Sequence, residues 1–326
     1  MRQLRAVWGS IIVASITWAL LAYIPNPSAS ASQIPPNRGG PPGRGSLDPP
    51  PLETDLTLLT VTVADKAGAV AGLGKERFQV LEDGVEQKIT YFWVDSRPIS
   101  VGFVLDGSNK MDDGMNEAIR GAGPAFLKSK RPDDEYFVIV FSDSPSMTIS
   151  YTTDAKRIPR VFPQTGESPL YDAIYNGIDA MKEAANPRKM LLVITAGFDN
   201  DRGMTDDQLT NFAIKQPVEV YSIQLGGTPV VANLLDLLSG VTGGRANLSS
   251  ASSFQIEAMC NEMALAVRSQ YLVGYKSTNR ETNGHRRGVK VKVTPPEGSS
   301  KLTVWTKSGY YGPKAPKTKS SAAGGK

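Results

Sequence analysis

A short polar segment that follows an apolar run carries the residues best suited to chemistry in this chain. The run at 99–105 ends at Asp106, and Gly107, Ser108 and Asn109 follow before Lys110. A carboxylate and a nearby hydroxyl are hard oxygen donors of the kind that bind Mg²⁺. The lysine ammonium repels such a cation. The segment therefore predicts either a metal site or a site whose metal has been replaced by lysine.

The middle of the chain alternates apolar runs with amphipathic segments. Four runs, ISVGFVLD, EYFVIVFSD, KMLLVITAG and VEVYSIQLG, are apolar enough for strands buried on both faces. Helices are expected at 112–130, 168–185, 205–216, 231–240 and 252–268. This order predicts an α/β domain over residues 98–269, with an open, mostly parallel sheet flanked by helices. Such sheets bind ligands at the carboxyl ends of their strands, where the loop after Leu105 lies.

Shorter strand patterns lie on both sides of this domain. Residues 56–97 contain LTLLTVTVAD and FQVLEDGVEQKITYFWV, with Asp83-Gly84 as a hairpin turn, and residues 270–313 contain four more runs. Each flank has too few strands to enclose a core. We therefore predict that the two flanks pair into one small β domain in which the α/β domain is inserted. We expect four tyrosines to lie in the core or at the edge of that domain: Tyr271, Tyr275, Tyr310 and Tyr311. The alternative is that they form an exposed recognition patch.

The beginning of the chain predicts export. A basic start and an apolar stretch precede Ala29-Ser30-Ala31, so residues 1–31 are predicted to be a signal peptide that is cleaved after Ala31. The alternative is an uncleaved segment that anchors the protein in a membrane. Residues 32–55 form a Pro/Gly-rich linker. The expected location is extracytoplasmic: secreted, periplasmic or at the cell surface.

The formal charge of +4 does not predict nucleic acid as a partner. Part of this charge lies in the signal peptide, and part lies in a basic tail at 314–326 that is predicted to be disordered. The folded part is therefore near neutral. Cys260 is the single cysteine and forms no internal disulfide, and we interpret it as a small buried hydrophobic residue.

Taken together, these segments resemble the von Willebrand factor A (VWFA)-related proteins first grouped from Acidobacteria. The resemblance spans about residues 56–313 and rests on the order of VTVADKAGAVAGLGKERFQVLEDGVEQKITYF, SVGFVLDGSNKM, SPLYDAIYNGI, KMLLVITAGFDN, RSQYLVGY and GYYGP. It implies a Rossmann-like VWFA domain, export from the cytoplasm, and a role that is usually non-enzymatic binding.

The resemblance also implies a metal-ion-dependent adhesion site at the top of the sheet. Such a site uses the motif Asp-x-Ser-x-Ser, a threonine from a second loop and an aspartate from a Thr-Asp-Gly turn. Asp106 and Ser108 match the first two positions, and Ser168 lies where the threonine is expected. Lys110 stands at the third motif position, and Ala196 replaces the aspartate.

These two replacements change the charge of the site in the same direction. An ammonium about 4 Å from a divalent ion is repelled by roughly 8 kcal/mol at an effective dielectric constant of about 20. We therefore predict a degenerate site without a cofactor, in which the Lys110 ammonium lies near Asp106 and replaces the cation. The alternative is weak or altered Mg²⁺ binding, restored by Glu167 or Asp199 while Lys110 points outward.

The predicted function is that of an exported, non-enzymatic protein-interaction module. A protein partner would contact the loops 106–111, 165–169 and 196–203 and bind through an acidic side chain of its own. The expected contact residues are Asn109, Lys110, Glu167, Phe198 and Asp199. Weak metal-dependent adhesion through these loops and a purely architectural role are the alternatives among binding proteins.

An enzyme is the alternative from another class. A hydrolase would use Ser108 and Lys110 as nucleophile and base, but Asp106 favours the charged form of the lysine and so opposes this use. His285 lies in the polar turn TNGHRRG and is interpreted as a solvated loop residue. The pair Gly243-Gly244 is interpreted as the end of a helix rather than as a phosphate-binding loop.

Overall fold

The structure, a computed structural model, describes residues 56–158, 165–200, 203–249 and 252–315. The predicted signal peptide, the predicted linker and most of the predicted basic tail lie outside the described residues. Among the residues that are described, no helix is both long and apolar enough to cross a lipid bilayer.

Strands and helices follow one another in an order close to the predicted one. The strands are β1 (Leu56–Asp65), β2 (Gly68–Ala69), β3 (Phe78–Glu82), β4 (Val85–Gln87), β5 (Ile89–Val94), β6 (Ile99–Asp106), β7 (Glu135–Phe141), β8 (Pro145–Thr152), β9 (Arg188–Thr195), β10 (Glu219–Gln224), β11 (Ala246–Leu248), β12 (Tyr271–Lys276), β13 (Arg286–Val293), β14 (Thr303–Trp305) and β15 (Gly309–Tyr311). The α-helices are α1 (Asp113–Leu127), α2 (Leu170–Ala180), α3 (Asp206–Ala213), α4 (Pro229–Thr242) and α5 (Ser253–Arg268). Short 3₁₀ helices lie at Lys75–Arg77, Ala155–Arg157 and Met181–Glu183.

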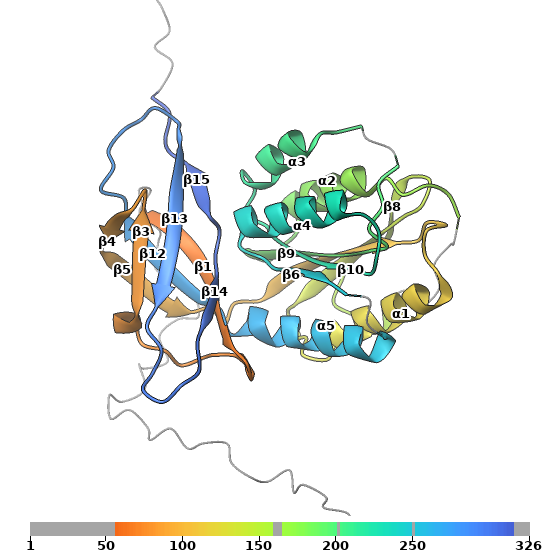
Figure 1. The fold of residues 1–326 in the computed structure, drawn as a ribbon, viewed down its shortest axis with the longest axis horizontal. Coiled ribbons are helices and arrows are strands. Elements are labelled where there is room, and N and C mark those ends of the chain that lie inside the picture. The colour runs from red at the N-terminus through yellow and green to blue at the C-terminus, as the bar shows by residue number, and fades with distance from the viewer. Residues whose placement is uncertain (1–55, 159–164, 201–202, 250–251, 316–326) are drawn as a thin grey trace, which may run out of the picture. The chain divides into compact units, whose positions relative to one another are not determined.

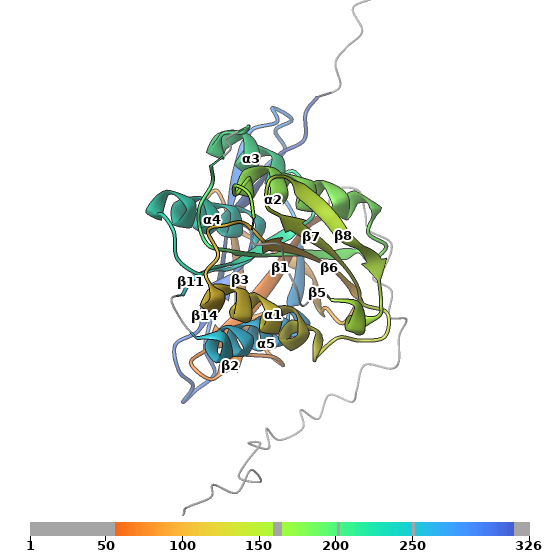
Figure 2. The ribbon, with the colours of Figure 1, turned by 90° about the vertical axis from the view of Figure 1, so that its right-hand side faces the viewer.

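The central part of the chain is an α/β domain built on one six-stranded sheet. The strand order is β11-β10-β9-β6-β7-β8, and all neighbouring pairs are parallel except β7 with β8. Helices α1 and α5 cover one face, and α2, α3 and α4 cover the other (Figure 2). Strand β6 is buried at all eight positions because it lies in the middle of the sheet. These features confirm the predicted Rossmann-like fold.

The sequence does not predict β8 or β11, which are the two edge strands of this sheet. Most β8 side chains are exposed or half-buried, and β11 has three residues, so neither shows the apolar run of a central strand. The helices also differ in length from the predicted ones. The helix expected at 112–130 ends at Leu127, and the one expected at 168–185 ends at Ala180 and continues as a 3₁₀ turn.

The two flanks pair with each other, as predicted. Figure 1 shows strands from the beginning of the described chain, in orange, beside strands from its end, in blue. Strand β1 pairs antiparallel with β12 and β14, and β3 pairs antiparallel with β13. Asp83 and Gly84, with φ values of 48° and 84°, close the predicted hairpin between β3 and β4. The strands form two sheets, with the orders β14-β1-β12-β5 and β15-β13-β3-β4. The core of the β domain includes Leu59, Val61, Phe78, Val80 and Val291.

The four tyrosines of the β domain lie in its core or at its edge. Tyr271 and Tyr275 are fully buried, Tyr310 is half-buried, and Tyr311 is 39% exposed.

The predicted disordered tail at 314–326 begins two residues too early. Lys314 forms a β-bridge with Asn283, and the backbone N–H of Ala315 donates to the carbonyl of Thr282, so these two residues belong to the β domain.

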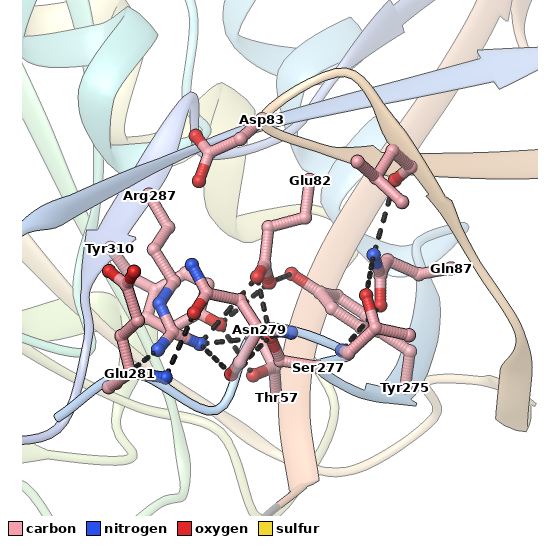
Figure 3. Close-up of polar contacts among 12 residues, drawn as sticks. Thr57, Glu82, Asp83, Gln87, Tyr275, Ser277, Asn279, Glu281, Arg287 and Tyr310 are labelled. Carbon is pink, nitrogen blue, oxygen red and sulfur yellow. Dashed lines mark hydrogen bonds and ion pairs between the residues drawn. The ribbon is translucent and has the colours of Figure 1, made fainter.

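A buried carboxylate organises one end of the β domain (Figure 3). Glu82 accepts hydrogen bonds from the hydroxyls of Tyr275 and Tyr310 at 2.8 and 2.7 Å. The Arg287 guanidinium lies 3.6 Å from the other carboxylate oxygen and donates to the carbonyls of Asn279 and Glu281. Burial and the neighbouring Glu82 raise the pKa of Tyr275 well above its usual value. This network fixes the loop between β12 and β13.

A second buried network joins the β domain to the α/β domain. The chain crosses between them near Asp95 and near Gln270, and Arg188 at the start of β9 binds both crossings. Its Nη1 donates to the carbonyls of Asp95 and Arg97, each at 3.1 Å, and its Nη2 donates to Gln270 Oε1 at 2.7 Å and to the carbonyl of Val267. Burial raises the pKa of Asp95, but hydrogen bonds and charge from Arg97 and Arg188 outweigh burial and lower it.

Candidate functional site at the carboxyl end of the parallel sheet

The candidate site lies where β6 and β9 end side by side. The two strands are parallel neighbours, with Leu105 opposite Ile194, so the loops that follow them leave the same edge of the sheet. The loop before α2 reaches the same edge. We call residues 107–112, 165–169 and 196–200 the top loops.

Asp106, the last residue of β6, is fully buried and bonded on both carboxylate oxygens. Oδ1 accepts from the backbone N–H of Ser108 at 3.0 Å. Oδ2 accepts from the Thr195 hydroxyl at 2.8 Å and from the backbone N–H of Ala196 at 2.9 Å. Three neutral donors therefore satisfy this buried charge.

Thr195 is the residue of the site that the sequence analysis missed. It directly precedes Ala196, the position at which the resemblance places an aspartate, and its hydroxyl is fully buried against Asp106. The threonine of the Thr-Asp-Gly pattern falls at this position, and that was the available signal. The pattern does not give the hydrogen bond itself, which joins residues 89 positions apart.

The two serines of the predicted site are both fully buried. The Ser108 hydroxyl oxygen accepts from the backbone N–H of Lys110 at 3.3 Å. The Ser168 hydroxyl donates to the carbonyl of Phe198 at 3.0 Å. The Ser108 hydroxyl therefore stabilises a turn within its own loop, and the Ser168 hydroxyl joins its loop to the one that contains Phe198.

The structure corrects the predicted position of the Lys110 ammonium. It lies 3.7 Å from a carboxylate oxygen of Glu167, on a half-exposed side chain, and not in an ion pair with Asp106. Asp106 does not need the ammonium because Thr195 and two backbone N–H groups already satisfy it. The same Glu167 oxygen accepts from the Asn200 side chain, so Glu167 connects the second and third loops.

Backbone hydrogen bonds tie the top loops together. The N–H of Asn109 donates to the carbonyl of Gly166 at 3.1 Å, and the N–H of Asn200 donates to the carbonyl of Ser168 at 3.2 Å. Asp199 accepts from the N–H of Tyr171, the second residue of α2, at 3.4 Å. Phe198 packs against the hydrophobic core below the loops. The expected contact residues thus lie on three connected loops, with the Asn109 side chain exposed.

The rim of the site is acidic. Exposed carboxylates lie on the top loops, on the turn between β7 and β8, and on the first turns of α1 and α3, while Lys110 is the one cation among the described residues of the same segments. Aspartates at helix N-termini are expected because they cap and stabilise the helix, as Asp112 does by accepting from the N–H of Met115. The acidic rim, as used below, consists of Asp112, Asp113, Asp143, Glu167, Asp206 and Asp207.

The other residues singled out in the sequence lie in structural positions. Cys260 is buried in α5, and burial raises the pKa of its thiol to about 12. His285 is exposed directly before β13. Gly243 ends α4 with a φ of 95°, which confirms the helix-end interpretation. Across the described residues, no cluster of three or more His, Cys, Asp or Glu is arranged to hold a metal ion.

Comparison with known proteins identifies the domain that carries this site. Residues 101–198 match the family model of the von Willebrand factor type A domain, so the chain contains a VWFA-related domain. The match includes Asp106 and the top loops as far as Phe198. A search of the curated proteins gives no match.

Solved structures with a similar fold are remote in sequence. Proximal thread matrix protein 1 from the mussel byssus is 13% identical over 57% of this chain and 51% of its own, with a TM-score of 0.45. The present chain thus matches about half the length of the mussel protein. The vWF domain of the pilus tip protein Mfa5 from Porphyromonas gingivalis is 10% identical over 53% and 95%, with a TM-score of 0.42. The PilB minor pilin from Streptococcus sanguinis is 12% identical over 53% and 62%, with a TM-score of 0.40. These TM-scores lie below 0.5, so the similarity assigns no role to individual residues.

Proposed function

We propose that this chain is an exported, non-enzymatic interaction protein whose top loops bind a partner protein without a resident metal ion. The observation that carries the proposal is the bonding of Asp106. Its Oδ1 accepts one hydrogen bond and its Oδ2 accepts two, so protein donors already use both oxygens that a cation would compete for.

The residues around Asp106 do not fit a Mg²⁺ ion. Mg²⁺ takes about six oxygens in near-octahedral geometry and favours carboxylates. Position 196 carries a methyl group, and Lys110 adds a positive charge next to Glu167, a carboxylate that could otherwise have moved toward a metal. The Ser168 hydroxyl donates to the carbonyl of Phe198, so its oxygen could still act as a ligand, but one hydroxyl does not replace the missing carboxylate.

The same geometry supports a binding role rather than hydrolysis. A Ser/Lys pair requires a neutral lysine amine in contact with the serine hydroxyl. Here the Lys110 ammonium pairs with Glu167. Within the described residues, the hydrogen bond of the Ser108 hydroxyl is to the backbone N–H of Lys110 and not to its side chain.

The acidic rim favours a basic partner over the acidic one expected from the sequence. An acidic partner side chain would have to displace Glu167 from Lys110 and approach the other five carboxylates of the rim. A lysine or arginine of the partner would instead be attracted by the rim. We therefore propose that the partner contributes a basic segment to this contact.

A calorimetric titration with Mg²⁺ and Mn²⁺ tests the metal-free site. The natural chain should give no binding heat, and the double variant Lys110→Ser with Ala196→Asp should gain binding because it removes a positive charge and adds a carboxylate. Micromolar or tighter binding of either ion by the natural chain would contradict the proposal.

Binding to immobilised peptides tests the charge of the partner. A lysine-rich peptide should bind the natural chain more tightly than a glutamate-rich peptide of equal length. Removing rim charge with Asp113→Asn and Glu167→Gln should weaken binding to the lysine-rich peptide, and Lys110→Met should strengthen it. Asp236→Asn, at an exposed position on α4, is the matched control and should have no effect. Weaker binding by Lys110→Met would instead favour an acidic partner.

N-terminal sequencing of the protein recovered from cell fractions tests export. The mature chain should begin at Ser32 and be found outside the cytoplasm. A chain that keeps residues 1–31 and is found in the membrane fraction would favour the anchored alternative.

A further inference from the structure

A pocket of about 610 Å³ lies at the opposite end of the parallel sheet from the top loops. Its walls come from the first residues of β6, β9 and β10 in the α/β domain and from β1, β15 and the segment before β15 in the β domain. A volume of this size is typical of pockets for small organic molecules. The lining includes the side chains of Leu58, Thr60, Arg188, Lys189, Glu219 and Lys307.

The walls of the pocket are partly apolar because side chains alternate along β1. Leu59 and Val61 face the core of the β domain, so Leu58 and Thr60 point to the other side, toward the pocket. The α/β domain contributes Val218 and Val241 to the lining. A ligand in this pocket could therefore bury an apolar part against both domains.

Lys307 differs from the other cations of the pocket in having a free ammonium. Arg97 and Arg188 pair with Asp95, and the Lys189 ammonium donates to the carbonyl of Met181 at 2.5 Å. Among the described residues, no hydrogen bond or ion pair is formed by the Lys307 ammonium, which lies 5.8 Å from the centre of the Tyr310 ring. Burial lowers the pKa of Lys307, as expected for a cation that lacks a partner.

The acidic side chain of the pocket does not neutralise this lysine. Glu219 accepts from the Gln270 side chain at 2.7 Å and from the Tyr221 hydroxyl at 3.1 Å, so its carboxylate is held by the junction between the domains. Burial raises the pKa of Glu219 despite these hydrogen bonds.

We propose that this pocket binds a small amphipathic anion, with the anionic head group on the Lys307 ammonium and the apolar part between β1 and the α/β domain. The shared chemistry is a carboxylate or phosphate attached to a short apolar chain or ring. This site lies away from the top loops, so it is independent of the proposed partner contact.

Calorimetric titration of the natural chain with octanoate, octyl phosphate and 1-octanol tests the proposal. At least one anionic probe should bind at least tenfold more tightly than the alcohol, which has the same apolar chain without the charge. Tighter binding of octanoate or of octyl phosphate identifies the preferred head group. Lys307→Met should weaken anion binding at least tenfold, and Lys307→Arg should retain it.

Two further variants keep the test independent of folding and of the top loops. Lys301→Met, at an exposed position in the same β domain, should bind the anionic probe like the natural chain. Leu58→Trp, on the wall formed by β1, should fill the apolar part of the pocket and weaken binding of the anionic probe while leaving Lys307 in place. Equal binding of the anions and the alcohol, or unchanged anion binding in a folded Lys307→Met variant, would overturn the proposal.

Discussion

The two ends of the parallel sheet each depend on a buried carboxylate, but they satisfy its charge in different ways. At the carboxyl end, Asp106 accepts from one hydroxyl and two backbone N–H groups, all within the α/β domain. At the amino end, Asp95 pairs with Arg97 at 2.7 Å and with Arg188 at 3.4 Å, and Arg188 also binds both crossings between the domains.

Asp106 is therefore a local anchor within one domain, whereas Asp95 and Arg188 form a connection between two domains. Neutral donors next to Asp106 satisfy its charge within the α/β domain, so neither Lys110 nor a carboxylate of the acidic rim takes part in neutralising it. The guanidinium groups at the other end are used by the structure itself. The Lys307 ammonium, close to that junction, is left for a ligand.

The largest expected effect is the loss of the connection between domains. Arg188→Met should lower the free energy of unfolding by about 3–5 kcal/mol, because it removes one partner of a buried ion pair and leaves carbonyl groups of both crossings without a donor. Urea unfolding followed by circular dichroism measures this. Arg120→Met, which removes an exposed pair with Glu117, is the control and should cost less than about 0.5 kcal/mol. If the two variants lowered the free energy of unfolding equally, Arg188 would not be a stabilising connection between the domains.

Asp106→Asn should lower the free energy of unfolding by about 2 kcal/mol at the other end of the sheet. The substitution keeps the shape but turns one acceptor into a donor that faces a hydroxyl or N–H group, and hydrogen bonds to a charged acceptor are worth about 1.5–3 kcal/mol each. The same denaturant titration measures it, with no metal present. A variant as stable as the natural chain would mean that the carboxylate has no anchoring role.

The Asp95 pairs should make stability depend on pH in the acid range. Because the pKa of Asp95 is lower in the folded than in the unfolded chain, its contribution is complete well above the unfolded value of about 3.9 and is lost as the pH falls through the folded pKa. Asp95→Asn should therefore be less stable at pH 7 but lose less stability between pH 5 and pH 2. Parallel pH profiles for the two proteins would contradict this.

The smallest expected effect is that of Lys110→Met. Its pair with Glu167 joins side chains that are 32% and 58% exposed, so removing it should change the free energy of unfolding by less than about 0.5 kcal/mol. If this variant alters peptide binding without altering the melting temperature, the top loops are a recognition surface rather than a structural one. A loss of more than about 1.5 kcal/mol would place Lys110 in the structural framework instead.

Much of the fold could be predicted because the signals are local. The apolar runs that became β6, β7, β9 and β10 are long and buried on both faces, and the turn at Asp83-Gly84 is set by its own backbone preferences. The edge strands β8 and β11 were missed because a strand paired on one side needs no apolar run. Asp106 and Ser108 were found by their position after such a run. Thr195 and the pairing of Lys110 with Glu167 were not found.

The sequence by itself determined the order of the helices and of the central strands, the pairing of the two flanks, and the edge at which polar residues gather. These follow from hydrophobic periodicity and from the need of short strands for partners. Only the tertiary structure decided which group satisfies each buried charge. That choice depends on distances of a few ångströms between residues far apart in the chain, such as Asp106 with Thr195 and Asp95 with Arg188. A pattern of residue types does not contain such distances, because the chain offers several donors of the same kind to each carboxylate and only packing decides which of them reach it.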